Sequence, residues 1–393
     1  MDTARARPFE IRVDEAVLAD LGVRLAATRL PPDQGPAGWD AGSNPAYLRE
    51  LLEHWRSAYD WRAQEAMLNT FAHFQAEVRG ADIHFIHERG HGPRALPLIL
   101  THGFPDSFTR FLELVPLLTD PASHGGDPED VFDVVVPSLP WCGFSRQLER
   151  GEGAMFGVHQ TWHELMTDVL GYERYGAHGG DWGSTITEQM ARSHAKSVIG
   201  IHLTDVPFWH SLRAPKDPTP AEKAYLDHVA QFQMQEGAYA MIQGRKPQTL
   251  ADGLDDSPIG LAAWLIEKFQ RWSDCGADLD SCYTKDQLLT NVMVYWVTES
   301  IGGSFTPYFD VLNAGAPRWI SEAVKQKLGS DDVPAAFAMF PKDLSHPPRE
   351  WAERFFNVRR WSEFSRGGHF AALEQPAELA ADIRAFFRPL RGD

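Results

Sequence analysis

The sequence has 393 residues, of which 43% are hydrophobic and 23% charged, and its formal net charge at pH 7 is −17. This acidic balance disfavours nucleic acids and anionic membrane surfaces as partners, because both carry negative charge. The sequence has no secretory signal pattern and no apolar run long enough to span a bilayer, so we expect a cytoplasmic protein without a membrane partner.

The first 72 residues are predicted to be mostly helical. A short alternating strand is predicted at 9–13, followed by helical patterns at 14–29, 48–55 and 61–71. Pro31 and Pro32 end the first of these helices, since proline cannot continue a helix. We therefore expect an N-terminal extension, residues 1–72, that packs against another part of the protein.

Strands and helices alternate over the next stretch of the chain. A β-hairpin is predicted at 73–87, and buried strands are predicted at 96–100, 131–136, 174–177 and 198–203. Helical patterns lie between them, at 107–118, 158–170 and 185–194. This alternation is typical of an α/β fold with a mostly parallel sheet and helices on both faces.

The alternation is interrupted between residues 207 and 330, where no buried strand is predicted. Helix starts appear at Thr219, Ser257 and Thr284. The first and third of these starts fit capping boxes. The α/β pattern then resumes, with strands at 333–340 and 358–364 and helices at 349–356 and 377–387. We expect an α/β core made of residues 73–206 and 331–393, with residues 207–330 inserted as a helical cap.

The segment His178–Ser184 reads His-Gly-Gly-Asp-Trp-Gly-Ser and lies between a predicted strand and a predicted helix. A strand, a sharp turn of small residues and a helix form a nucleophile elbow, whose central residue is usually serine. Here the central residue is Asp181. A carboxylate can open an electrophilic sp³ carbon and leave an alkyl ester on the enzyme. The alternative is a glycine-rich turn with a helix-capping aspartate.

Three further strand ends carry candidate partners for Asp181. His369 follows the last predicted strand between glycine and phenylalanine, where an imidazole can take a proton from water. Asp343, after the strand at 333–340, is the candidate that orients this imidazole. Asp205 follows the strand at 198–203 and is the competing acid. The alternatives are an ordinary loop histidine and solvated turn aspartates.

A further strand end, after the predicted strand at 96–100, carries His102-Gly103-Phe104-Pro105. The backbone N–H groups of Phe104 and Trp182 are predicted to form an oxyanion hole around the carbonyl oxygen of the nucleophile. His102 is predicted to be structural. The alternative for the whole tetrapeptide is a simple turn that ends a strand.

Three motifs together resemble the microsomal-type epoxide hydrolases of the α/β-hydrolase superfamily. They are Gly-Gly-Asp-Trp-Gly-Ser at 179–184, His-Gly-Phe-Pro at 102–105 and Gly-Gly-His-Phe-Ala-Ala at 367–372. The resemblance covers nearly the whole chain. It implies the α/β-hydrolase fold, with the N-terminal extension wrapped around the cap. It also implies conversion of an epoxide to a vicinal diol through an ester on Asp181.

The resemblance further implies two cap tyrosines that donate to the epoxide oxygen. Local matching assigns these roles to Tyr239 and Tyr308, and the alternative for each is a tyrosine that only packs the cap. The expected reactants are a small-molecule epoxide and water, with no metal or organic cofactor. The three cysteines, Cys142, Cys275 and Cys282, form neither a metal-ligand pattern nor a disulfide framework. Self-association of the chain is left open.

The sequence departs from the family pattern at a few positions. The membrane-bound members carry an N-terminal anchor that is not expected here. The acid is often glutamate, whereas Asp343 is shorter by one methylene. Asp106 stands where a small residue is common, and position 104 is phenylalanine rather than tryptophan. These departures leave the mechanism intact and bear on the choice of substrate.

Other function classes have to be weighed against this one. A haloalkane dehalogenase also uses aspartate, histidine and an acid, but it needs donors for a halide, and the two cap tyrosines favour an epoxide. Asp181 disfavours a serine-type esterase. A catalytically silent binding protein of this fold typically lacks a catalytic residue, and here every catalytic position is filled.

The cap is rich in aromatic residues, which suits a bulky or aryl-bearing epoxide. They are Phe208, Trp209, Phe232, Trp264, Phe269, Trp272 and Trp296. For most of them the alternative is that they pack the core of the cap. The resemblance extends to bacterial members of antibiotic pathways, some of which hydrate aryl epoxides of enediyne precursors.

Overall fold

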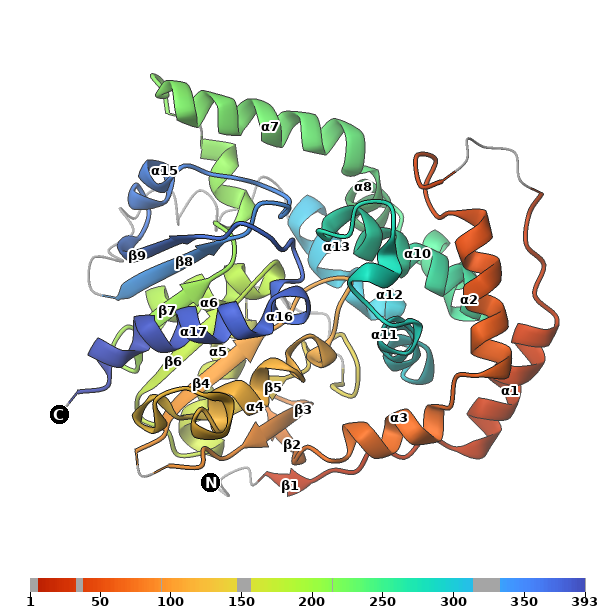
Figure 1. The fold of residues 1–393 in the computed structure, drawn as a ribbon, viewed down its shortest axis with the longest axis horizontal. Helices are drawn as coiled ribbons and strands as arrows, with labels where there is room; N and C mark the ends of the chain where they lie inside the picture. Colours follow the sequence, from red (N-terminus) through yellow and green to blue (C-terminus); the bar gives the residue numbers. More distant parts are fainter. Residues whose placement is uncertain are drawn as a thin grey trace.

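The computed structural model describes residues 6–32, 38–92, 94–146, 157–213, 215–313 and 333–392. Within these ranges a central sheet has the strand order β1-β2-β3-β5-β4-β6-β7-β8-β9 (Figure 1). The strands are β1 (Arg7–Pro8), β2 (His73–Val78), β3 (Ala81–Glu88), β4 (Leu96–Thr101), β5 (Phe132–Pro137), β6 (Tyr175–Gly179), β7 (Val198–Leu203), β8 (Pro334–Met339) and β9 (Asn357–Glu363).

In this order, the pairs β1–β2, β2–β3 and β3–β5 are antiparallel, and all pairs from β5–β4 to β8–β9 are parallel. Strands β4, β5 and β8 are almost continuously apolar and buried. They need this composition because helices cover both faces of the parallel part of the sheet. Helices α4 (Leu114–Thr119) and α17 (Pro376–Phe387) pack together in front of it in Figure 1, and α5 (Val158–Glu164) and α6 (Trp182–Ser193) lie behind it. The predicted α/β-hydrolase architecture is confirmed.

Seven helices are inserted between β7 and β8 within the described residues. They are α7 (Pro220–Glu236), α8 (Ala238–Arg245), α9 (Pro247–Asp256), α10 (Pro258–Trp272), α11 (Lys285–Val297), α12 (Ile301–Ser304) and α13 (Thr306–Asn313). The capping boxes predicted at Thr219 and Thr284 are both formed. The end of the predicted cap, 314–330, lies outside the described residues.

The N-terminal segment packs against these inserted helices, as Figure 1 shows. It contains α1 (Glu15–Ala26), α2 (Pro45–Ser57) and α3 (Trp61–Leu68). Helix α1 contacts α10, and α2 contacts both α10 and α11. Polar bonds add to these contacts, including Arg24 Nη1 to Asp256 Oδ1 at 2.6 Å and Tyr47 Oη to Asp280 Oδ1 at 2.8 Å. The division of the chain into extension, core and cap stays our proposal.

Two predicted elements differ from the structure. The strand predicted at 9–13 is not formed, because side chains of the α3 region bind its backbone: Asn69 bonds both the N–H and the C=O of Ile11. The helix predicted at 107–118 is instead a 3-10 turn, Phe108–Phe111, followed by α4. Pro116 explains the break, since it cannot donate the N–H that a continuous helix would require.

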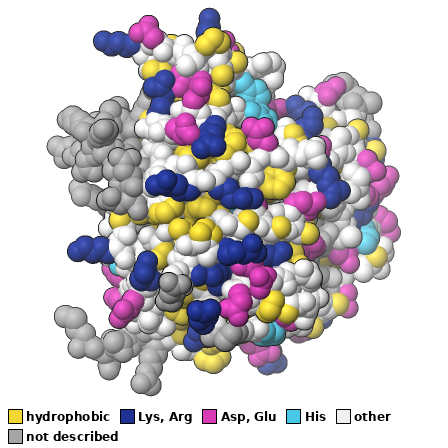
Figure 2. All heavy atoms as spheres, turned by 60° about the vertical axis from the view of Figure 1, so that its left-hand side comes forward, with side chains coloured by type: hydrophobic (Ala, Val, Ile, Leu, Met, Phe, Trp, Pro, Cys, Tyr) yellow, Lys and Arg dark blue, Asp and Glu magenta, His cyan; other side chains and the backbone are white. Residues whose placement is uncertain are grey.

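The remaining helices are α15 (Arg349–Glu353) and α16 (Ala371–Glu374). Figure 2 shows the side of the molecule that carries the edge strand β9, where basic, acidic and apolar side chains are interspersed. Ion pairs there include Arg360 with Asp382 and Arg354 with Glu222. Charged side chains along an edge strand discourage edge-to-edge pairing. None of the helices in the described ranges combines the length and the apolarity needed to cross a membrane.

Candidate active site

Asp181 lies at the tip of a strained turn between β6 and α6. Its backbone has φ 58° and ψ −126°, a conformation that residues with a side chain rarely adopt. The turn is pressed against the neighbouring strand: a Cβ atom on Gly183 would lie 2.0 Å from the carbonyl oxygen of Thr101. A Cβ atom on Gly179 would lie 2.3 Å from the carbonyl oxygen of Gly183. The small residues of the motif therefore make the elbow geometrically possible.

The two oxygens of the Asp181 carboxylate face different partners. Oδ1 accepts a hydrogen bond of 2.9 Å from the backbone N–H of Phe104. Oδ2 lies 3.6 Å from Nε2 of His369. Among the described residues, the second predicted oxyanion donor, the backbone N–H of Trp182, makes no hydrogen bond to this carboxylate. Gly103 is required here for space, because a Cβ atom on it would lie 2.2 Å from Asp181 Oδ1.

The imidazole of His369 connects Asp181 with Asp343. Its Nδ1 lies 2.7 Å from Oδ1 of Asp343, and both side chains are buried. Burial alone would lower the pKa of His369, but the carboxylates of Asp343 and Asp181 outweigh it and raise that pKa to about 10. His369 in turn outweighs the effect of burial on Asp343 and lowers the pKa of that carboxyl.

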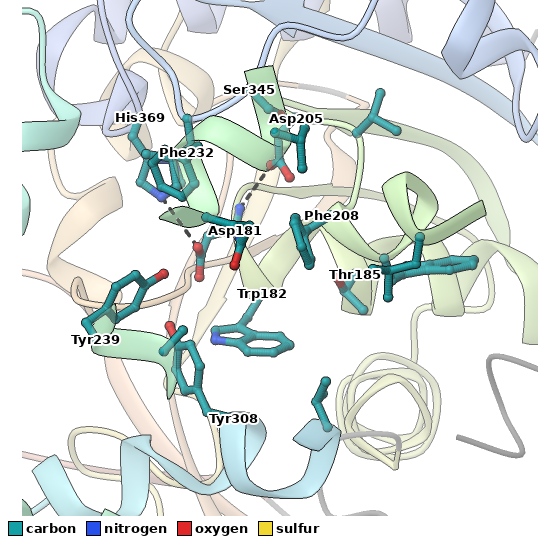
Figure 3. Close-up of a pocket in the computed structure, with 18 of the residues that line it drawn as sticks. Asp181, Trp182, Thr185, Asp205, Phe208, Phe232, Tyr239, Tyr308, Ser345 and His369 are labelled. Atoms are coloured by element: carbon teal, nitrogen blue, oxygen red, sulfur yellow. Dashed lines mark hydrogen bonds and ion pairs between the residues drawn. The ribbon is translucent and has the colours of Figure 1, made fainter. Parts of the chain in front are cut away.

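Asp205, the competing candidate acid, lies in the same cavity but contacts the other side of Asp181. Its Oδ1 accepts the backbone N–H of Asp181 at 3.0 Å and the hydroxyl of Ser184. Figure 3 shows Asp181 between His369 and Asp205. Burial, together with the charge of Asp343, raises the pKa of Asp205 to about 7. Of the two candidate acids, only Asp343 contacts the imidazole.

The two cap tyrosines point into the same space as Asp181 (Figure 3). Tyr239 comes from α8 and Tyr308 from α13, and their ring centroids lie 5.8 Å apart. The ring of Phe104 packs against both, at 6.1 Å and 5.7 Å between centroids. Burial raises the pKa of both phenols, so each remains a neutral O–H donor.

These groups line a cavity of about 240 Å³. Its wall is mainly apolar and contains Phe208, Trp209, Leu212, Val229, Phe232, Met241, Val311, Leu312 and Leu344. Within the described residues the lining contains no lysine or arginine. Three of the seven cap aromatics singled out from the sequence thus face the cavity. The others pack elsewhere: for example, Phe269 stacks on Phe370 with centroids 4.2 Å apart.

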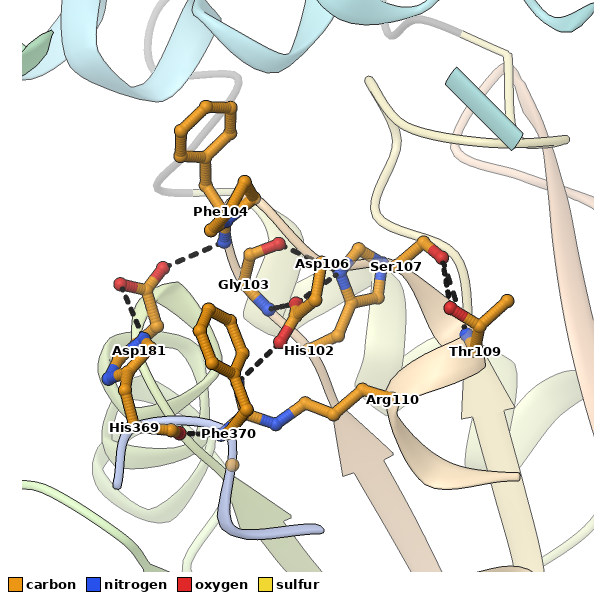
Figure 4. A network of polar contacts seen from close by, with 12 residues as sticks. His102, Gly103, Phe104, Asp106, Ser107, Thr109, Arg110, Asp181, His369 and Phe370 are labelled. Carbon is orange, nitrogen blue, oxygen red and sulfur yellow. Dashed lines mark hydrogen bonds and ion pairs between the residues drawn. The ribbon is translucent and has the colours of Figure 1, made fainter. Parts of the chain in front are cut away.

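An unpredicted ion pair lies behind the loop 102–105 (Figure 4). The buried Asp106 accepts the backbone N–H of Gly103 at 3.0 Å and pairs with the buried Arg110. Arg110 also donates to the carbonyl oxygen of His369 at 2.7 Å. The pair therefore links the loop that holds Asp181 Oδ1 to the loop that carries the imidazole. The spacing of four residues between Asp106 and Arg110 was the one available signal in the sequence.

In the described residues no cluster of three or more His, Cys, Asp or Glu side chains is arranged to hold a metal ion. The cysteines are free.

Comparison with known proteins identifies relatives over the whole chain. Residues 6–111 match the family described as the epoxide hydrolase N terminus, and residues 97–259 match the alpha/beta hydrolase fold. A Stigmatella aurantiaca relative, provisionally assigned as an epoxide hydrolase, is 40% identical, with 98% of this chain and 85% of the relative covered. Epoxide hydrolase 1 of Sus scrofa is 35% identical, with 97% and 88% covered.

Solved structures agree with these relatives. The juvenile hormone epoxide hydrolase of the silkworm Bombyx mori is similar with a TM-score of 0.85 at 29% identity, covering 99% of this chain and 95% of that one. The Aspergillus niger epoxide hydrolase is similar with a TM-score of 0.83 at 29% identity, covering 99% and 97%.

Proposed function

This chain belongs to the epoxide hydrolase family, and we propose that it opens its substrate through a covalent ester on Asp181. The observation that carries this proposal is that the two oxygens of this carboxylate have different partners. Oδ1 is bound by the Phe104 N–H, whereas Oδ2 is directed toward His369 without a hydrogen bond. Oδ2 is therefore the free nucleophile, and Oδ1 becomes the carbonyl oxygen of the ester.

The first step opens the epoxide. Oδ2 of Asp181 forms a bond to one oxirane carbon as the bond from that carbon to the epoxide oxygen breaks. Tyr308 and Tyr239 donate to the leaving oxygen, and one of them transfers its proton to the alkoxide. A neutral phenol suits this role because the alkoxide is strongly basic and the surrounding cavity is apolar. The product of this step is a hydroxyalkyl ester and a phenolate, and the phenolate then regains a proton from the imidazolium of His369, which becomes neutral.

The second step hydrolyses the ester. Nε2 of His369 takes a proton from water, and the hydroxide adds to the carbonyl carbon of the Asp181 ester. The Phe104 N–H stabilises the negative charge that develops on Oδ1. When the intermediate collapses, the departing alkoxide takes the proton of the new carboxylic acid of Asp181 and leaves as a vicinal diol. Asp181 is then again a carboxylate and His369, which keeps the proton taken from water, is again an imidazolium, so the enzyme is restored.

A single turnover in ¹⁸O water tests the covalent step. We expect the label in the Asp181 carboxylate, because water attacks the ester carbonyl and not the substrate carbon. Label found only in the diol would mean direct hydrolysis and would refute the proposal. The variant His369→Gln should accumulate the alkyl-enzyme, measured as a mass adduct on the peptide that contains Asp181.

We propose a bulky, uncharged and apolar epoxide, such as an aryl epoxide, as the substrate. Three aromatic side chains, Phe208, Trp209 and Phe232, support this choice, and no cation in the described lining would pair with an acidic substrate. An aryl epoxide also fits the antibiotic-pathway members named above. The test compares kcat/KM for styrene oxide, a short aliphatic epoxide and an epoxide that carries a carboxylate. A preference for the carboxylate substrate would refute the choice.

A further inference from the structure

The loop that carries His369 is held by the cap as well as by the core. After α10 the cap backbone crosses this loop, and the carbonyl oxygen of Trp272 accepts the backbone N–H of His369 at 2.8 Å. One residue earlier in the loop, a Cβ atom on Gly368 would lie 2.5 Å from that same carbonyl oxygen. The carboxylate of Asp274 accepts the N–H of Gly367 at 2.9 Å. Gly368, directly before the histidine, therefore lets the cap backbone approach closely.

One carboxylate, that of Glu374, joins these two segments. Its Oε2 accepts the backbone N–H of Asp274 in the cap at 2.8 Å and that of Gly368 at 2.9 Å. Its Oε1 accepts the backbone N–H of Phe370 at 3.1 Å. A single side chain thus binds one amide of the cap and the amides on both sides of His369.

We propose that Glu374 is a positioning residue for the base of the reaction. It fixes the backbone on either side of His369 to the cap, and so it holds Nε2 at the distance from Asp181 that water activation requires. Glu374 does not line the cavity, so it acts through His369 and not on the substrate. The proposal rests on the proposed function, because it assigns to His369 the hydrolysis of the ester.

The geometry explains why His369 needs this support. The imidazole has one hydrogen bond, from Nδ1 to Asp343, so its remaining freedom is limited mainly by its backbone. Displacement of a reacting group by about 1 Å costs on the order of a hundredfold in rate. The ring of Trp272 packs on the imidazole with centroids 5.4 Å apart, so a shift of the cap segment would also remove this contact.

The test is the substitution Glu374→Gln, with the two half-reactions measured separately. Glutamine keeps one acceptor oxygen and presents an NH₂ group to a backbone N–H, so the three bonds cannot all persist. We expect ester hydrolysis to slow at least tenfold, while formation of the alkyl-enzyme changes less than twofold. Equal slowing of both steps, or slowing of neither, would overturn the proposal. The matched control is Glu378→Gln, which breaks only a pair with the exposed Arg366 and should leave both steps unchanged.

A second measurement separates this proposal from the covalent mechanism. In the resting enzyme, the proton resonance of the His369 Nδ1–Asp343 bond reports the position of the imidazole without any substrate. We expect this resonance to shift or broaden in Glu374→Gln and to stay unchanged in Glu378→Gln. An unchanged resonance in Glu374→Gln would overturn the positioning role, whatever the labelling experiment shows. If Glu374→Gln does not fold, Glu374→Asp, which keeps both oxygens on a shorter stem, is measured in the same way with the same criteria.

Discussion

Nε2 of His369 and Oδ2 of Asp181 face each other at 3.6 Å, so the charge of the Asp181 carboxylate acts directly on the imidazole. In the resting enzyme this charge, together with that of Asp343, raises the pKa of His369 to about 10 in spite of burial. Formation of the ester removes the charge of Asp181. The alkylation step should therefore lower the pKa of His369, so that the imidazolium gives its proton to the phenolate and becomes the neutral base that hydrolysis needs.

The first prediction is that Asp181→Asn lowers the pKa of His369. A carboxylate favours the charged imidazolium, and a neutral amide does not, so the sign of the change is downward. The measurement is an NMR titration of the His369 imidazole in the two proteins between pH 5 and 11. The variant mimics the neutral ester without any substrate. The same pKa in both proteins would contradict this account of how alkylation activates the base.

The second prediction separates the two candidate acids. In Asp343→Asn the imidazole loses its ionic partner and its tautomer is no longer enforced, so ester hydrolysis should fall on the order of a thousandfold or more. In Asp205→Asn the amide oxygen can still accept the N–H of Asp181, so hydrolysis should stay within about tenfold of wild type. Rapid-quench measurement of ester decay checks both. A larger loss of ester hydrolysis in Asp205→Asn than in Asp343→Asn would reverse the assignment of the acid.

The sequence predicted the sheet and the strand ends that carry Asp181, Asp343 and His369, because buried parallel strands and glycine-rich turns leave strong local patterns. It left the choice between Asp205 and Asp343 open for a physical reason. Both follow strands, β7 and β8, that are neighbours in the sheet, and only side-chain direction decides which one reaches His369.

Contacts between distant loops could not be predicted. Arg110 binds the backbone of His369, 259 residues away, and Glu374 binds Asp274, 100 residues away. No local pattern marks such bonds. The positions of the aromatic cap residues could not be predicted either. Composition does not tell which rings face a cavity and which, like Phe269, pack against the core.

The third prediction concerns the space beside the nucleophile. In Gly103→Ala the new methyl group would lie 2.2 Å from Asp181 Oδ1, so the carboxylate must move away from the Phe104 N–H. Loss of one such donor costs on the order of a hundredfold in rate. We expect at least this loss in epoxide turnover. The control is Gly253→Ala on α9, where the methyl group meets no atom within 4 Å and activity should not change. Normal turnover in Gly103→Ala would contradict the oxyanion geometry.

The fourth prediction concerns the buried pair of Asp106 and Arg110 behind the loop 102–105. Arg110→Met leaves the carboxylate of Asp106 buried without its partner, which costs about 3–5 kcal/mol of unfolding free energy. The double variant Asp106→Asn/Arg110→Met removes the buried charge as well, so it should be more stable than Arg110→Met. Urea unfolding of the two variants and of Asp106→Asn measures the coupling. If the changes in unfolding free energy of the two single variants add up to the change in the double variant, the two residues do not act as a pair.

The fifth prediction concerns Tyr308, because its hydroxyl is assigned to the epoxide oxygen. Tyr308→Phe keeps the ring, and with it the packing on Trp182 and Phe104, so the melting temperature should stay close to that of wild type. Removing a single preorganised donor costs on the order of 3 kcal/mol, which is roughly a hundredfold in the alkylation rate. Turnover should not be abolished, since Tyr239 still donates.

Which of the two reaction steps slows in Tyr308→Phe distinguishes this role of Tyr308 from simple packing. Hydrolysis of a preformed ester depends on His369 and Asp343, so it should stay near the wild-type rate in Tyr308→Phe. Single-turnover kinetics with separate observation of ester formation and ester decay checks both steps. Tyr47→Phe, which removes a hydroxyl bonded to Asp280, is the control and should alter neither step, because neither residue lines the cavity. Unchanged ester formation in Tyr308→Phe would mean that this tyrosine only packs the cap, and that the epoxide oxygen takes its proton from another group.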